Sequence, residues 1–246
     1  MSQQNKTAVP TSSLMLGVKE LYATGIYSDL TISCGARTFK VHKSILHPQS
    51  SVFRTLLSGN FKEASPEQGT ITLNDDDPKV LQVLLHHLYN FTFDDRSRGA
   101  EAEAPFAVRV YAIADKYDVS PLRAMAAQKL TSVADPGPEG LENFIAAIYA
   151  IDECCNPKDA TLWNIVSPKI VANIDALADD ERFFALIQEL PALNKALLKR
   201  KSITGGGMAE GWEGAEEDGQ EYPDDQYIGT YRGRGGHHLG SGRRLG

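Results

Sequence analysis

The chain contains 246 residues, of which 42% are apolar and 23% charged, and its formal net charge at pH 7 is −7. This length is typical of one domain of common size with an appended segment, and the apolar fraction suffices for a buried core. The excess of acidic residues argues against a chain built mainly to bind nucleic acid or an anionic membrane.

The N-terminal part divides into a leader and a helix. Residues 1–12 have no apolar run, which predicts a disordered leader and shows no signal peptide. No stretch of the sequence approaches the ~20 apolar residues of a membrane span, so we expect a cytoplasmic or nuclear protein. A helix is expected over residues 13–24, because Leu14, Val18 and Leu21 recur at i, i+4 and i+7.

Residues 30–41 alternate between apolar and polar side chains, which is the period of a β-strand. Gly35 and Ala36 interrupt the pattern and can form a type II′ turn, which needs glycine at its first central position. The apolar positions share one face of the predicted hairpin: Leu30, Ile32 and Cys34 in the first strand, Phe39 and Val41 in the second.

The period changes from two to helical after this hairpin. A short apolar turn is expected at residues 45–46 and a helix with one apolar face at residues 52–57. Ser50 or Ser51 is available as the N-cap of that helix, and Gly59 can end it.

These patterns resemble the BTB (POZ) domain family in order, spacing and residue type. The matching segments are SDL at 28–30, FKVHK at 39–43, Leu46, SSVF at 50–53, LLSGNFKE at 56–63 and YAIADKYDV at 111–119. The resemblance covers residues 13–133 and implies an α+β fold, with a small three-stranded sheet region flanked by a cluster of α-helices. BTB domains are protein-interaction modules, so the resemblance implies no enzyme activity, catalytic residue or cofactor.

The resemblance also implies a homodimer. The helix carrying Leu14, Val18 and Leu21 would pack across a second copy, and Asp29 and Lys43 would lie in a charged pocket at the dimer groove. The alternative interpretation of these two charged residues is that Asp29 accepts local backbone hydrogen bonds and Lys43 is solvated.

His42 and the cysteines predict no metal site. No second ligand has a suitable spacing from His42, which we interpret as a hydrogen-bonded structural residue. The three cysteines include the adjacent pair Cys154 and Cys155, which suits neither a disulfide framework nor zinc.

A second candidate site is Phe61, Lys62 and Glu63. In relatives that bind cullin-3, an apolar-x-Glu sequence at this place lies at the cullin surface. An aromatic anchor beside an acidic residue is also a common arrangement in interfaces. The alternative is that Phe61 closes the core under its loop.

The middle of the chain continues with one strand and one helix. A short strand is expected at residues 71–73. Asp77 can cap a following helix that has Pro78 at its first position. His86 and His87 are expected on the polar side or edge of this helix.

Two further helices complete the segment that resembles the family. Residues 91–104 are expected to form a mobile surface loop. Pro105 then starts a helix, and Ser120 with Pro121 caps the next one. Two prolines and a glycine at residues 135–138 oppose a continuous helix and mark a boundary.

The sequence predicts a helical segment followed by a disordered one in the C-terminal part. Residues 139–201 are expected to form an all-α extension, broken at Pro191, which resembles a truncated BACK region. Residues 205–246 have few large apolar side chains and predict a disordered acidic and Gly-Arg tail. The Arg-Gly segment at 232–236 is compatible with weak RNA binding, although a solvated tail is the preferred interpretation.

Three hypotheses on function follow. The first is a BTB adaptor that bridges a cullin-3-type ubiquitin ligase to an unknown target protein. The second is a dimerising scaffold, or a transcription-associated BTB protein, without a ligase role. The third is weak association with RNA through the tail, which the acidic net charge disfavours.

Overall fold

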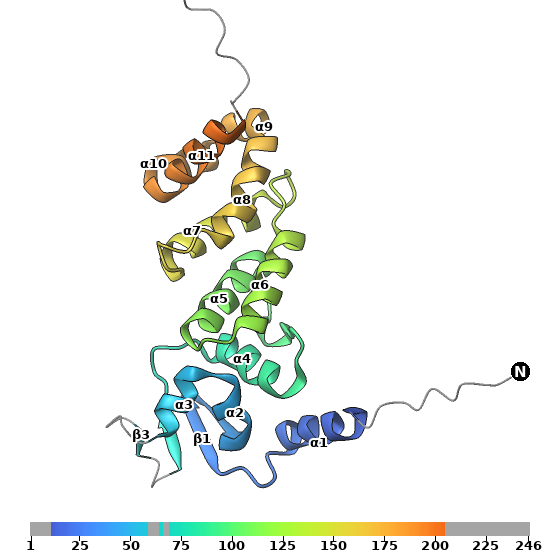
Figure 1. The fold of residues 1–246 in the computed structure, drawn as a ribbon. Coiled ribbons are helices and arrows are strands. Elements are labelled where there is room, and N and C mark those ends of the chain that lie inside the picture. Colours follow the sequence, from blue (N-terminus) through green and yellow to red (C-terminus); the bar gives the residue numbers. More distant parts are fainter. Residues whose placement is uncertain (1–10, 59–63, 66–68, 205–246) are drawn as a thin grey trace, which may run out of the picture. The chain divides into compact units, whose positions relative to one another are not determined.

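The computed structural model of the protein describes residues 11–58, 64–65 and 69–204 (Figure 1). The predicted leader therefore lies almost wholly outside the described residues, as do the tail at 205–246 and the segment from Gly59 to Glu63. Met1–Gly207 makes up one compact unit, which contains every element named below.

A mixed sheet forms the end of the molecule nearest the N-terminal helix. Its strand order is β2-β1-β4-β3, with bounds Leu30–Cys34 (β1), Arg37–Val41 (β2), Ala64–Ser65 (β3) and Thr70–Thr72 (β4). Strand β1 runs antiparallel to β2 and parallel to β4. The three predicted strands are confirmed, and β3 adds a two-residue strand that the sequence did not predict.

The hairpin between β1 and β2 follows the sequence pattern. Gly35 has a φ of +54°, whereas Ala36 is outside the positive region, which agrees with a type II′ turn. The predicted inward side chains of β1, together with Val41, are buried in the core, and Phe39 is half-buried beside them. The hairpin therefore exposes Thr38 and Lys40 and buries most of its apolar face.

Six α-helices surround and extend from this sheet. They are Thr11–Thr24 (α1), Lys43–Gln49 (α2), Ser51–Leu57 (α3), Pro78–Asn90 (α4), Glu103–Lys116 (α5) and Ser120–Val133 (α6). Ser50 caps α3 by accepting a hydrogen bond from the Phe53 amide at 3.1 Å. The predicted cap of α6 is wrong, because Val119 occupies that position without a side-chain hydrogen bond and Ser120 is the first helical residue.

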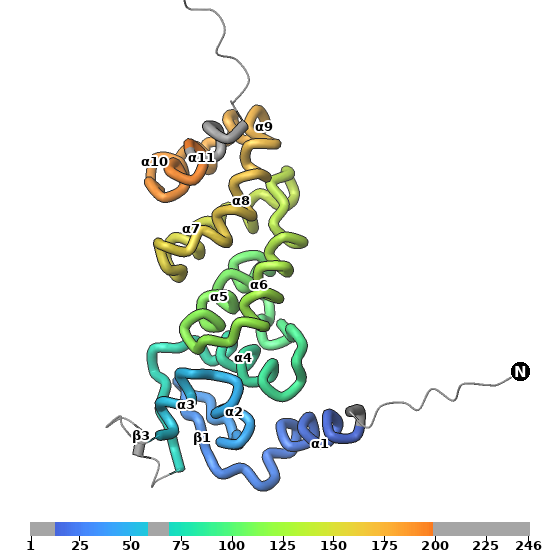
Figure 2. The backbone as a smooth tube through the Cα atoms, viewed as in Figure 1, coloured from blue at the N-terminus to red at the C-terminus, as the bar shows by residue number. Residues whose placement is uncertain are grey.

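Five more helices follow, and the smooth tube of Figure 2 shows their path. They are Leu141–Cys154 (α7), Thr161–Ala172 (α8), Ile174–Ala178 (α9), Glu181–Glu189 (α10) and Pro191–Thr204 (α11). Helix α7 packs along α5, and α8 contacts both α6 and α11. One hydrophobic core therefore runs through both parts, including Phe106 of α5 and Phe144 of α7.

Helix α4 is buried on more sides than its sequence pattern predicts. His87 was expected on the polar side or edge, but it is only 2% exposed, and its Nδ1 lies 3.3 Å from the Thr92 carbonyl oxygen. The reason is that α1, α2, α5 and the 3-10 helix η2 (Arg96–Arg98) all contact α4. Burial lowers the pKa of His87.

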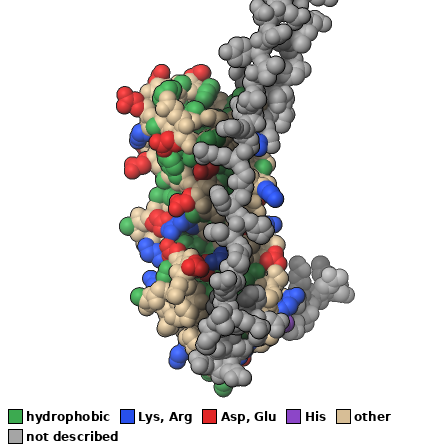
Figure 3. All heavy atoms as spheres, turned by 90° about the vertical axis from the view of Figure 1, so that its left-hand side faces the viewer, with side chains coloured by type: hydrophobic (Ala, Val, Ile, Leu, Met, Phe, Trp, Pro, Cys, Tyr) green, Lys and Arg blue, Asp and Glu red, His purple; other side chains and the backbone are tan. Residues whose placement is uncertain are grey.

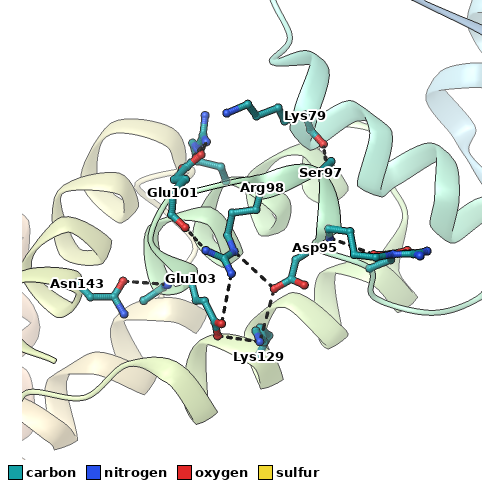
Figure 4. A network of polar contacts seen from close by, with 12 residues as sticks. Lys79, Asp95, Ser97, Arg98, Glu101, Glu103, Lys129 and Asn143 are labelled. Carbon is teal, nitrogen blue, oxygen red and sulfur yellow. Dashed lines mark hydrogen bonds and ion pairs between the residues drawn. The ribbon is translucent and has the colours of Figure 1, made fainter. Parts of the chain in front are cut away.

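The segment at 91–104 is not the mobile loop that its composition predicted. Lys129 of α6 lies 2.9 Å from a Glu103 carboxylate oxygen and 3.6 Å from one of Asp95, as Figure 4 shows. Arg98 of η2 lies 3.4 Å from the same Glu103 side chain, and the Ser97 hydroxyl donates to a backbone oxygen of α4 at 2.9 Å. A network of partly buried charges is more effective than isolated surface pairs. The network therefore holds this connection against α4 and α6.

Asp77 and Arg109 join α4, α5 and the same connection. The Asp77 carboxylate caps α4 by accepting from the Lys79 amide at 2.7 Å, as predicted, and also accepts from Arg109 at 2.7 Å. Arg109 forms a second ion pair with Glu101. Burial by itself would raise the pKa of Asp77, but the hydrogen bonds from Lys79 and Arg109 outweigh it and lower that pKa.

The N-terminus of α5 is capped by a residue of α7. Ala102 precedes the helix and has no side chain that could accept a hydrogen bond. Asn143 Oδ1 instead accepts from the Ala104 amide at 3.1 Å. The helical extension thus satisfies a backbone donor of the preceding part.

His42 links three elements through one chain of hydrogen bonds. The Tyr89 hydroxyl accepts from the His42 amide at 2.8 Å and lies 2.9 Å from His42 Nδ1. His42 Nε2 lies 2.8 Å from the Ile26 carbonyl oxygen, which can only accept, so Nε2 carries a proton and Nδ1 accepts from Tyr89. Burial raises the pKa of Tyr89 to about 12, which keeps the hydroxyl proton. These contacts support the interpretation of His42 as a structural residue.

Replacing Asp77 by Ala should lower the free energy of unfolding by about 1–2 kcal/mol, because the cap of α4 is lost. Urea unfolding at pH 7 measures this change, and Asp75→Ala is the control, since Asp75 is exposed and adjacent. Because folding lowers the pKa of Asp77, its contribution should be complete above the pKa of an unfolded aspartate, about 4, and disappear as the pH falls through the lower folded value. Equal losses for both variants at pH 7 would contradict the capping role.

Replacing Tyr89 by Phe should cost about 1–3 kcal/mol, because the His42 amide and Nδ1 lose their common partner in a buried site. Tyr149→Phe is the matched control, since the Tyr149 hydroxyl donates to Glu189 at an exposed position. Its loss should stay within about 0.5 kcal/mol. Thermal and urea unfolding of the two variants would refute the network if the order of these losses were reversed.

Candidate functional site

The N-terminal half of α1 exposes two large apolar side chains. Leu14 is 73% exposed and Leu16 is 67% exposed, and in Figure 1 the N-terminal end of α1 points away from the neighbouring helices. Val18 and Leu21 are half-buried and contact the hydrophobic core. The three α1 residues predicted for the dimer interface therefore differ in exposure, because only Leu14 lies largely in solvent.

The turn after α1 adds two apolar side chains to the surface. Ile26 is exposed, and Tyr27 is 84% exposed with a φ of +59°. Four of the ten exposed large apolar side chains among the described residues lie between positions 14 and 27. Leu16, Ile26 and Tyr27 were not predicted as interface residues. Their exposure could have been suspected, because none of the three occupies a position on the predicted apolar face of the helix.

The C-terminal half of α1 is held on α4 by an aromatic contact. The Tyr22 ring lies 5.0 Å from the Tyr89 ring and 5.7 Å from the His86 ring, measured between centroids. Burial, assisted by the charge of Asp94, raises the pKa of Tyr22 to about 12. Helix α1 is therefore fixed in place while its exposed leucines remain available to a partner.

Asp29 and Lys43 are brought together, but through the backbone. The Lys43 amide donates to Asp29 Oδ1 at 2.8 Å. Lys43 is the first residue of α2, and His42 at the N-cap position offers no side-chain hydrogen bond to that helix. Asp29 thus satisfies a free amide of α2, which agrees with the alternative of a local backbone acceptor. Both residues adjoin the turn that carries Ile26 and Tyr27, and their role in a dimer stays a prediction.

Phe61, Lys62 and Glu63 lie outside the described residues. Helix α3, which precedes this segment, and β4, which follows it after β3, border a groove of about 230 Å³ that is lined in part by Val52, Leu56 and Tyr117. Its polar wall is fixed, because Asp76 accepts from the Tyr117 hydroxyl at 2.6 Å and from Lys116 at 2.8 Å. Burial and the Asp76 carboxylate raise the pKa of Tyr117, so its hydroxyl keeps the proton that it donates.

The surface charge of the described residues is mixed. On the face shown in Figure 3, acidic and basic side chains lie among apolar ones. No three His, Cys, Asp or Glu side chains in the described part of the chain gather closely enough to hold a metal ion. Within the same residues, no helix combines the length and apolar character that crossing a bilayer requires.

Comparison with known proteins identifies the fold of this region. The family model described as "BTB/POZ domain" matches residues 18–133. The BTB domain of zebrafish PATZ1, a solved structure, aligns with a TM-score of 0.41 and 13% sequence identity, and covers 53% of this chain and 99% of that one.

Two curated relatives show how far the similarity extends. "BTB/POZ and MATH domain-containing protein 6" of Arabidopsis thaliana is 25% identical over 82% of this chain and 50% of its own length. "Kelch repeat and BTB domain-containing protein 4" of Homo sapiens is 26% identical over 67% of this chain and 28% of its own length. The chain thus spans half or less of these two relatives. The match of the family model, together with the sheet and helices described above, shows that residues 18–133 of this chain are a BTB/POZ domain, a protein-interaction module.

Proposed function

We propose that this protein is a homodimeric adaptor that links a cullin-3-type ubiquitin ligase to a target protein in the cytoplasm or nucleus. The observation that carries the homodimer is the exposure of Leu14 and Leu16 at the N-terminal end of a helix whose C-terminal half is fixed. The ligase role rests on the resemblance of residues 61–63 to the cullin-contacting motif.

The exposed part of α1 favours association on energetic grounds. Full burial of one leucine side chain contributes about 1.5–3 kcal/mol. In a two-fold symmetric dimer each contact occurs twice, so an α1 leucine that enters the interface is buried in both copies. Tyr27 adds an aromatic side chain, a residue type that is enriched in interfaces.

The cullin contact would use the segment between α3 and β4. Phe61 would act as the aromatic anchor and Glu63 as a charge at the rim of the interface. The neighbouring groove, with Val52 and Leu56 in its lining, offers an apolar extension of the same surface. A dimerising scaffold without a ligase role is the alternative, and it predicts the same dimer without cullin binding.

Replacing both Leu14 and Leu16 by Asp should convert the dimer into a monomer, because two charges per copy would have to be buried without partners. Light scattering of the full chain at tens of micromolar should give about twice the chain mass of 26.9 kDa for the wild type and once that mass for the variant. Leu198→Asp is the control, since Leu198 is 69% exposed on α11, and it should leave the mass unchanged. A wild-type monomer would rule out the dimer.

Truncating Phe61 to Ala should weaken binding to a cullin-3 N-terminal domain by about 2 kcal/mol, or some thirtyfold in Kd, if it is an anchor. Glu63→Ala should have a smaller effect, as a solvated rim charge does. Titration calorimetry measures both.

Phe184→Ala provides the control for this experiment, because Phe184 is 58% exposed on α10 and its loss should not change cullin binding. The dimer mass must also stay constant in every variant. Absence of binding by the wild type would leave the scaffold as the better description.

A further inference from the structure

Strand β2 ends the sheet on one side. In the order β2-β1-β4-β3, its only neighbour in the described chain is β1. Three of its five side chains, those of Arg37, Thr38 and Lys40, are exposed. The strand is therefore reachable from solvent along its outer edge.

The register shows which backbone groups face outward. On β1, the Thr31 amide donates to the Gly69 carbonyl and the Ser33 carbonyl accepts from Leu73, so these residues face β4. Their antiparallel partners on β2 are Lys40 and Thr38. Because backbone groups alternate between the two sides of a strand, the amides and carbonyls of Thr38 and Lys40 point away from β1.

These outward groups have no hydrogen-bond partner within the described residues. Neither the backbone nor the side-chain hydrogen bonds of that part of the chain include the amide or carbonyl of Thr38 or Lys40. A row of unpaired donors and acceptors on an edge strand is a template for another strand.

A groove of about 490 Å³ runs beside this edge, between β2 and the C-terminal end of α1. Tyr22 and Phe39, both half-buried, contribute apolar surface to it, and Gln82 of α4 adds a polar group. At one end Gly25 closes the groove, because a Cβ on this glycine would lie 3.2 Å from Lys40 Cβ. The space suits a short extended segment centred on Thr38.

The charge of the groove specifies the occupant. Arg37 and Lys40 both line it, and neither forms an ion pair with any described carboxylate. Arg37 Nη1 donates to Gln82 Oε1 at 2.7 Å and keeps further N–H donors free. Asp94 borders the adjoining groove, but Arg96 neutralises it. Two edges of β2 from two copies would bring four cations together, which disfavours a second copy as the occupant.

We propose that the free edge of β2 binds an acidic peptide segment of another protein in extended conformation, which adds a strand to the sheet. Thr38 and Lys40 supply the backbone hydrogen bonds, and Arg37 and Lys40 contact carboxylates on the two faces of the added strand. Side chains opposite Phe39 enter the groove beside Tyr22. This site is independent of the dimer and of cullin binding.

The test uses full-length protein and a library of eight-residue peptides with Asp or Glu at alternate positions and apolar residues between. Selected peptides should bind with a Kd that rises at least tenfold for Lys40→Glu and less than twofold for Lys158→Glu, an equal charge change at a remote exposed position. Thr38→Pro removes an outward amide, a change that edge strands tolerate, and should abolish binding without lowering the melting temperature. A peptide N-methylated on its pairing edge should not bind.

Five results would overturn the proposal, and the last of them concerns the dimer mass. The first three are failure of the wild type to select any peptide, equal binding of the N-methylated peptide, and unchanged binding by Thr38→Pro when that variant is folded. The fourth is selection only after residues 205–246 are removed, which would assign the edge to the acidic segment of the chain itself. A dimer mass that falls in Thr38→Pro would assign the edge to a second copy and exclude a peptide from another protein.

Discussion

The burial of α4 on nearly every side is the constraint on which the rest of the structure depends. Its buried residues include apolar side chains over most of the circumference of the helix and two with polar groups, His87 and Tyr89. Each polar group in such a place needs a partner, since an unsatisfied one costs about 1–3 kcal/mol. The partners come from the following loop for His87 and from His42, which joins the hairpin to α2, for Tyr89. The polar groups of one helix therefore help to fix both connections against it.

This constraint also determines the surfaces that remain free. Tyr22 fixes the C-terminal half of α1 on α4, whereas Leu14 and Leu16 in its N-terminal half remain in solvent. Gln82 of α4 holds Arg37 beside the edge of β2. The first surface is apolar and suits a second copy of the same helix, whereas the second offers backbone hydrogen bonds and positive charge. The proposed partners of the two surfaces differ because the chemistry of the surfaces differs.

The sequence was sufficient for most features that are decided by near neighbours, the cap of α6 excepted. The strands, the turn at Gly35, and the caps Ser50 and Asp77 depend on residues within a few positions, and they follow the predictions. The loop at 91–104 did not follow its prediction. Lys129, which forms ion pairs with this loop, is more than 20 residues away in the sequence. The burial of His87 could not be predicted for the same reason, because the helical period of a sequence does not show how many neighbouring elements will cover the helix.

The candidate site residues also differ in whether near neighbours in the sequence determine them. Leu14 could be predicted because one helix face must be apolar, but the exposure of Ile26 and Tyr27 follows from a turn with a left-handed residue. The unpaired edge of β2 needs the strand order, which alternation along the chain does not contain. Phe61 lies outside the described residues, so its environment is known only through the family resemblance.

The cap that α7 provides to α5 has a consequence for synthesis of the protein. Asn143 follows Ala104 by 39 residues, so the first turn of α5 lacks this acceptor until much of α7 has left the ribosome. Phe106 likewise belongs to a core that includes Phe144. A nascent chain that stops after α6 would expose both an uncapped helix end and apolar surface. Folding of the BTB/POZ domain should therefore be completed only after the helix that follows it has been synthesised, so the two parts should fold together.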